Sequence, residues 1–229
     1  SYNKALGART AAAGYKNGKI YSGGQVVDGI GGGICQISST LYNAVLLANL
    51  EITDRSNHCF ETSYVPAGRD ATVNWGTVDF QFKNNRKYPI KIETTAGGGI
   101  ATAKIHGLKE ENEYEVVIQS KVTSYISRTT RYKNDSTMDE GKEVIEDNGF
   151  DGCNSETYKI LKLNGEVVSQ ALISRDSYDP MDRVIIRGTK KVVKPEQEVP
   201  VNKGNEEQEP TQEQNQTENQ EENNNKPNT

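Results

Sequence analysis

The sequence is short of the residues from which metal centres and disulfide frameworks are built. Its 229 residues include only three cysteines and two histidines, and no group of them has the spacing of zinc ligands. An odd number of cysteines leaves at least one thiol unpaired. We therefore expect no metal ion and no cofactor, and a thiol remains available for covalent chemistry.

Long apolar runs are also missing. No stretch approaches the twenty or so apolar residues that cross a bilayer, and no signal peptide is visible at the amino end. Lysines and arginines are scattered among acidic residues, so there is no basic stripe that would favour a nucleic acid partner. Because "SYNKALG" looks like the inside of a motif, we expect a signal or membrane anchor upstream of this fragment.

Apolar residues make up 33% of the chain and are scarcest at its carboxyl end. From Pro195 onward, nine glutamates stand against two lysines, a charge of about −7 in a chain whose total is −5. The remainder is then about +2, so the acidity belongs to the tail. So few apolar side chains cannot offset the entropy lost on folding. We predict a disordered acidic tail, rich in Gln, Asn and Glu, over 195–229.

One segment has a helical pattern, and it follows a run of glycines. Its apolar residues recur at steps of three and four: Ile37, Leu41, Ala44, Val45 and Ala48. This pattern predicts a helix over residues 35–48.

Strand patterns dominate the rest of the chain. Turn signals at Gly97–Gly99 and at Asn164-Gly165 predict hairpins, and Asn17-Gly18 predicts another. The expected fold class is α+β. A mixed domain over 1–107 has one main helix packed on β-strands. An elongated all-β module over 108–194 and the disordered tail follow it.

Cys35 stands where a thiol becomes reactive. It opens the predicted helix, whose first turn presents unpaired amide donors and a positive partial charge. Both stabilise a thiolate, which is the nucleophilic form. Gly32 and Gly33 leave room for a substrate carbonyl and for backbone amides that face its oxyanion. Gln36 and Ser38, in the first turn, are candidate hydrogen-bond donors to substrate.

Two other interpretations of this segment stay open. Free cysteines are among the most buried residue types, so Cys35 also fits a small core residue beneath a tight turn. A glycine-rich turn at a helix start also binds anions. The Lys-Ser/Thr pair of a nucleotide-binding loop does not follow the glycines, which disfavours a nucleotide site.

A nucleophilic cysteine needs a base, and the two histidines are the candidates. His58 lies in the polar segment that leaves the helix, whereas His106 lies at a strand end by the domain boundary. His58 is therefore the better placed. Asp70 fits the third role, which is to hold the imidazole in one tautomer, although its "GRD" is also an ordinary turn with a salt bridge.

Three further residues near this segment are weaker candidates. Arg69 and Arg55 are candidates for recognising a substrate carboxylate, although solvated arginines are commoner. Cys59, beside His58, is a competing nucleophile that lacks the helix start and the glycines, so it ranks below Cys35.

Two stretches of the sequence resemble known families. "GIGGGICQISSTLYNAVLLANLEITDRSNHCFETSYVPAGRDATVNWGTVDFQFKN" resembles the VanW-like domain of bacterial cell-envelope proteins, and "SYNKALGARTAAAGYKNG" resembles the family segment before it. "GFDGCNSETYKILKLNGEVVSQALISRDSYDPMDRVIIRGTK" resembles the G5 type of β module. Within it, Cys153 is expected in an ordinary loop and is given no role.

The resemblance implies an activity that composition and spacing alone do not. Some VanW-like proteins act as L,D-transpeptidases, with the essential cysteine in a Gly-Gly-Gly-x-Cys-Gln motif that Cys35 matches. His58 and Asp70 match the family's histidine before "SYVP" and its "GRDAT" aspartate. This implies a catalytic Cys35, His58 and Asp70 that form 3-3 cross-links between peptidoglycan stem peptides through a thioester.

The same resemblance implies a location and two alternatives. The protein would act outside the cell, in the envelope of a Gram-positive bacterium, with the β module touching cell-wall polymers. One alternative is a cysteine peptidase or amidase of stem peptides that uses water as the acceptor. The other is a non-catalytic peptidoglycan-binding protein in which the glycines hold a carboxylate.

Overall fold

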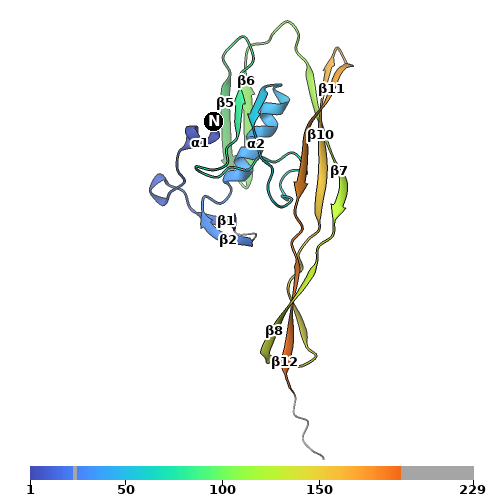
Figure 1. Ribbon diagram of the computed structural model, residues 1–229. Coiled ribbons are helices and arrows are strands. Elements are labelled where there is room, and N and C mark those ends of the chain that lie inside the picture. Colours follow the sequence, from blue (N-terminus) through green and yellow to red (C-terminus); the bar gives the residue numbers. More distant parts are fainter. Residues whose placement is uncertain (23–24, 192–229) are drawn as a thin grey trace, which may run out of the picture. The chain divides into compact units, whose positions relative to one another are not determined.

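The structure, a computed structural model, describes residues 1–22 and 25–191. The tail predicted to be disordered, 195–229, lies outside these residues. Two short helical turns and a hairpin open the chain, and the main helix and the remaining strands follow (Figure 1). In chain order, the elements before the second domain are α1 (Tyr2–Leu6), η1 (Ala11–Ala13), β1 (Asn17–Ser22), β2 (Gln25–Ile30), α2 (Ile34–Leu47), β3 (Glu51–Asp54), β4 (Gln81–Lys83), β5 (Lys91–Gly97) and β6 (Ile100–His106).

The second part of the chain contains only strands. They are β7 (Glu115–Ile126), β8 (Thr130–Asp139), β9 (Glu143–Asp147), β10 (Gly152–Leu163), β11 (Glu166–Tyr178) and β12 (Arg183–Lys190). One sheet has the order β11-β10-β7 and another has the order β8-β12-β9. The predicted fold class is confirmed: one main helix lies in the amino-terminal part and an all-β module follows.

The first core forms around the apolar face of α2. The helix begins one residue before the predicted start and packs against β6 and β7. The ring of Tyr42 meets Phe80 edge-on, with centroids 5.6 Å apart. Burial of these side chains removes apolar surface from water and fixes the helix in place. The buried members of this core are Tyr2, Leu41, Tyr42, Val45, Leu46, Leu50, Ala71, Val73 and Phe80.

The hairpin predictions have mixed outcomes. β5 and β6 pair antiparallel, and Gly98 and Gly99 make the turn with positive φ, as the glycine run predicted. β10 and β11 likewise pair across Asn164 and Gly165. The predicted turn at Asn17-Gly18 is wrong, because both residues lie inside β1, which pairs with β2 up to Ser22↔Gln25.

Two separate structural constraints explain why positions 32 and 33, before α2, are glycine. Gly33 is the N-cap of α2 with a φ of 86°, a left-handed conformation that other residues rarely adopt. Gly32 lies against β1, where an added Cβ would come within 2.5 Å of the Cα of Gly18. The backbone approach therefore requires glycine at position 32, and the turn geometry favours it at position 33.

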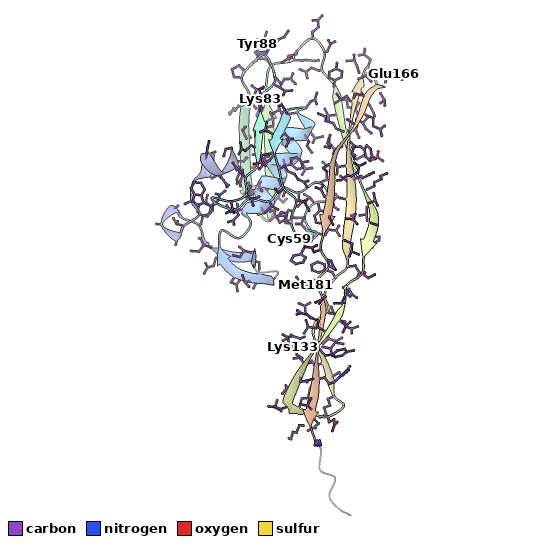
Figure 2. All side chains as sticks on the ribbon, in the orientation of Figure 1. Cys59, Lys83, Tyr88, Lys133, Glu166 and Met181 are labelled. Atoms are coloured by element: carbon purple, nitrogen blue, oxygen red, sulfur yellow. The ribbon has the colours of Figure 1, made fainter. Side chains whose placement is uncertain are left out.

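The part of the chain described by the structure packs as one compact unit. The loop after β3 lies against β10 and β11, and Figure 2 labels Cys59 beside these strands. The N–H of Asp179 donates to the carbonyl of Cys59 at 2.6 Å. Within the described residues, no helix is both long and apolar enough to cross a bilayer.

Candidate active site

The thiol of Cys35 lies in the first turn of α2. Cys35 is the second residue of the helix and is half-buried. Its Sγ lies 3.5 Å from the carbonyl oxygen of Val73, to which the protonated thiol donates. The N–H groups of Ile34, Gln36 and Ile37 donate to glycine carbonyls of the preceding turn. The N–H of Cys35 has no such acceptor among the described residues, so it is a donor next to the sulfur.

His58 and Asp70 meet in the interior. Both are buried, with exposed fractions of 6% and 1%. Nδ1 of His58 lies 2.6 Å from Oδ2 of Asp70, and the backbone N–H of His58 donates to the same oxygen at 2.7 Å. The ring therefore presents Nε2 on its other side, where the hydroxyl of Tyr64 lies 3.4 Å away.

The imidazole of His58 also interacts with Cys35. Burial alone lowers the pKa of His58, but hydrogen bonds to Asp70 and Cys35 and their negative charges raise it to about 9. The ring is therefore positively charged at neutral pH. The structure thus brings the three predicted catalytic residues together in the order Cys35, His58, Asp70.

Asp70 is held as a carboxylate by donors on both oxygens. Burial raises the pKa of Asp70, but the hydrogen bonds from His58 and Tyr178 and the charge of Arg55 lower it below the ordinary value. Oδ1 accepts the hydroxyl of Tyr178 at 2.6 Å and Nη2 of Arg55 at 2.9 Å. A buried charge is tolerated when it is paired and hydrogen-bonded in this way.

The sequence did not predict two residues of the hydrogen-bond network around Asp70 and Arg55. Tyr178 and Asp176 belong to β11, far along the chain from Asp70, and no local pattern marks them. From its residue type, Arg55 is a candidate ligand for a substrate carboxylate. The structure shows it bound to carboxylates of the chain itself, with Nη1 2.5 Å from Oδ1 of Asp176.

The predicted substrate-binding residues differ in their exposure and in whether the protein itself already binds their side chains. Gln36 is exposed at the start of α2, and Gly32 and Gly33 form the turn before it. Ser38 is fully buried, and its hydroxyl lies 3.1 Å from the carbonyl of Cys35 and 2.5 Å from that of Ala71. Arg69 donates to Oδ1 of Asn43 at 2.5 Å and to the carbonyl of Ile118 at 3.3 Å. Both side chains are therefore engaged by the protein.

The remaining histidine and cysteines are spread over the chain. His106 is exposed at the end of β6, 3.2 Å from Oε2 of Glu93. Cys59 is exposed, and Cys153 is buried. The expectation that Cys153 lies in an ordinary loop is wrong, because it lies in β10, packed with Ala67 and Tyr178. Burial and the nearby Glu61 carboxylate raise the pKa of the Cys153 thiol to about 11, which keeps it protonated.

The domain organisation defines the class of protein. Residues 1–106 match the family model described as VanW like protein, and residues 117–190 match the model described as G5 domain. The chain therefore carries a VanW-like domain followed by a G5 domain, and the resemblance predicted from the sequence is confirmed.

Two curated relatives are similar to the first domain. The "Uncharacterized protein YoaR" of Bacillus subtilis (strain 168) is 50% identical over 99 residues, which are 43% of this chain and 33% of that protein. The "Vancomycin B-type resistance protein VanW" of Enterococcus faecalis (strain ATCC 700802 / V583) is 31% identical over 86 residues, 35% of this chain and 31% of that protein. The chain spans about a third of the length of these relatives.

Two solved structures are similar to part of the chain. One, described as "IgA1 Protease G5 domain structure", is 24% identical with a TM-score of 0.25, over 35% of this chain and 98% of that chain. The other, described as "Crystal structure of HP0197-G5", is 17% identical with a TM-score of 0.21, over 33% of this chain and 99% of that chain.

Proposed function

We propose that this chain is the catalytic part of a cysteine-dependent L,D-transpeptidase of the bacterial cell envelope. The observation that carries the proposal is the contact chain from Cys35 through His58 to the buried Asp70. Nucleophile, base and orienting carboxylate are the three roles of a catalytic triad. The VanW-like and G5 domains support a site of action at the envelope, because G5 domains are typical of surface and secreted bacterial proteins.

The first half-reaction transfers an acyl group to the thiol. The thiolate of Cys35 attacks the carbonyl carbon of the third residue of a donor stem peptide. The carbon–nitrogen bond to the terminal D-Ala then breaks, and the leaving amine takes a proton from the imidazolium of His58. The products are a Cys35 thioester and free D-Ala, and His58 is left neutral.

The second half-reaction transfers the acyl group to an amine. The side-chain amine of the third residue of another stem peptide attacks the thioester carbonyl and loses a proton to His58. The carbon–sulfur bond breaks, which releases a 3-3 cross-linked dimer and restores the thiolate and the imidazolium. Asp70 holds the tautomer and balances the charge on the ring throughout.

The backbone N–H of Cys35 is a candidate hydrogen-bond donor to the oxyanion that forms in each half-reaction. Each half-reaction develops negative charge on the carbonyl oxygen next to the sulfur. A backbone donor that needs no rearrangement is worth several kcal/mol there, about 3 in well-studied acyl transfer. Because Gly33 has open space where its Cβ would lie, that side of the turn leaves room for the substrate.

Arg9 is a second candidate, beside Arg69, for the substrate carboxylate. Its side chain packs beside Gly31, in the turn that leads to Cys35. Its guanidinium lies between the rings of Tyr2 and the half-exposed Trp75, 5.6 and 5.7 Å from their centres. Nη2 of Arg9 is buried without an acceptor among the described residues. A carboxylate that displaces the indole of Trp75 would satisfy this donor.

Incubation with a disaccharide tetrapeptide, followed by chromatography and mass spectrometry of the products, tests the proposal. We expect cross-linked dimers and an equal amount of free D-Ala. Trimmed monomers without dimers would mean that water is the acceptor, and the protein would then be a peptidase. No turnover, together with slow alkylation of Cys35 by iodoacetamide at about pH 6, would favour a non-catalytic wall-binding protein.

A further inference from the structure

The second domain reaches the candidate active site through the fully buried Tyr178, the last residue of β11. Its hydroxyl donates to Oδ1 of Asp70 at 2.6 Å and accepts the N–H of Gly68 at 2.7 Å. The phenol therefore links the backbone of the "GRD" turn to the carboxylate that this turn carries. The VanW-like domain does not supply this contact itself.

Arg55 makes a second connection between the domains. Its guanidinium donates to Asp70 at 2.9 Å and to Asp176 of β11 at 2.5 Å, so it lies between one carboxylate of each domain. Asp176 also accepts the hydroxyl of Ser174 at 2.8 Å. Arg55 stacks over the ring of Tyr42 at 5.2 Å. A planar guanidinium held on three sides has little freedom to turn.

The loop that carries His58 and Asp70 is tightly packed against β10 and β11. An added Cβ at Gly68 would come within 2.1 Å of the hydroxyl oxygen of Thr157 in β10. The side chain of Asn57 donates to the carbonyl of Ser177 at 2.8 Å. Asn57 and Gly68 lie on either side of His58 in the sequence, so the loop that carries His58 and Asp70 packs against β10 and β11.

We propose that the G5 domain is an integral part of the candidate active site, and that Tyr178 is a positioning residue that fixes the carboxylate of Asp70 with Oδ2 facing His58. Tyr178 and Arg55 occupy Oδ1, so the other oxygen is left for the ring and the N–H of His58. A carboxylate held at both oxygens cannot rotate away from the imidazole. This inference rests on the geometry of the site and does not depend on which reaction the thiol performs.

Proton NMR on the full chain tests this role. The chain has two histidines, and the exposed His106 serves as an internal reference for the buried His58. The Nδ1–H of His58 should give a downfield resonance that disappears when acid protonates Asp70. Tyr178→Phe removes one donor to this carboxylate, so the midpoint of the loss should rise by about one pH unit. The charged groups around Asp70, which are Arg55, His58 and Asp176, stay unchanged.

Tyr125→Phe is the matched control, because Tyr125 belongs to the same domain and is 75% exposed. In Tyr125→Phe, the pH at which half of the His58 Nδ1–H signal is lost should equal that of the wild type. An unchanged midpoint in a folded Tyr178→Phe variant would overturn the proposal.

A second measurement needs no substitution. In wild-type protein labelled at the Cζ carbon of tyrosine, the Tyr178 signal should shift with the same midpoint as the His58 proton, because both report one carboxylate. A different midpoint, or no shift, would overturn the proposal even if Tyr178→Phe fails to fold. Transpeptidation is measured in neither experiment, so a failure of the proposed function leaves this result intact.

Discussion

One oxygen of Asp70 holds His58 in two ways. Oδ2 accepts the backbone N–H of His58 at 2.7 Å and lies 2.6 Å from its Nδ1. The backbone contact fixes where the residue sits, and the ring contact fixes how the imidazole is turned. Nε2, on the other side of the ring, lies 3.4 Å from the hydroxyl of Tyr64. Under the proposed function, Nε2 is the nitrogen that exchanges a proton during catalysis.

Asp70→Asn should separate charge from shape at this contact. The amide keeps the size of the carboxylate but removes its negative charge, so the pKa of His58 should fall below about 9. The rate of acyl transfer to Cys35 should fall roughly 10²- to 10⁴-fold, as for other orienting carboxylates. Adduct formation followed over time by mass spectrometry gives the rate. Asp28→Asn, at an exposed ion pair with Lys19, should leave it unchanged; equal rates in both variants would contradict the assignment.

Cys35→Ala should lower the pKa of His58, because the sulfur is one of the groups that raise it. An NMR titration of the two histidines measures the change, with His106 as reference. Cys59→Ala is the matched control, since Cys59 is the sequence neighbour of His58 but is exposed. A titration of His58 that is the same in Cys35→Ala and wild type would mean that the two side chains do not interact.

The stability of the protein should depend on pH with a defined sign. The folded pKa of His58, about 9, lies above its ordinary value of 6.5. Protonation of His58 therefore contributes stability that is fully present below about 6.5 and is lost as the pH rises through about 9. Urea unfolding at several pH values measures this. The loss across that window should be smaller in His58→Gln than in wild type, and an equal loss would contradict the prediction.

Gly32→Ala should destabilise the fold, because its Cβ would come within 2.5 Å of the Cα of Gly18. We expect a loss of about 1–3 kcal/mol in the free energy of unfolding, as for other overpacked positions. Gly97→Ala is the control, since Gly97 has an ordinary φ and open space around its Cβ. Urea unfolding should place the control within about 0.5 kcal/mol of wild type. A stable Gly32→Ala would show that the turn can move away from β1.

Arg9→Ala should weaken binding of a donor peptide with a free terminal carboxylate by about tenfold or more, the cost of one charged hydrogen bond. An amidated donor should bind Arg9→Ala and wild type equally. Lys4→Ala controls for general charge, because Lys4 is exposed in α1. Calorimetric titration in a Cys35→Ala background measures binding without turnover. An equal loss for both donors would rule out a carboxylate contact at Arg9.

Local patterns predicted the main helix and several of the strands and turns. The three- and four-residue steps from Ile37 to Ala48 placed α2 within a residue of its observed bounds, and Asn164-Gly165 placed the β10–β11 turn. β8 and β9 escaped prediction because their exposed faces carry mostly polar residues, which leaves no alternating apolar signal. Asn17-Gly18 misled because the pairing of β1 with β2 overrode the local turn preference.

The candidate site was predictable only where its residues lie in one stretch of chain. Cys35, His58 and Asp70 are close enough in sequence for a motif to connect them. Tyr178 lies 108 residues beyond Asp70, and a contact at that separation depends on how the domains pack, which no periodicity records. The same packing gave Arg55 its carboxylate partners within the chain, which its residue type alone did not reveal.

Intact-protein mass spectrometry after brief incubation with a disaccharide tetrapeptide tests the central claim most directly. We predict a wild-type adduct with the mass of the donor minus D-Ala, located on Cys35 by peptide mapping and released by hydroxylamine as a thioester. Cys59→Ala should carry the same adduct, and Cys35→Ala should carry none. Dimer formation by Cys35→Ala, or an adduct on another residue, would contradict the account.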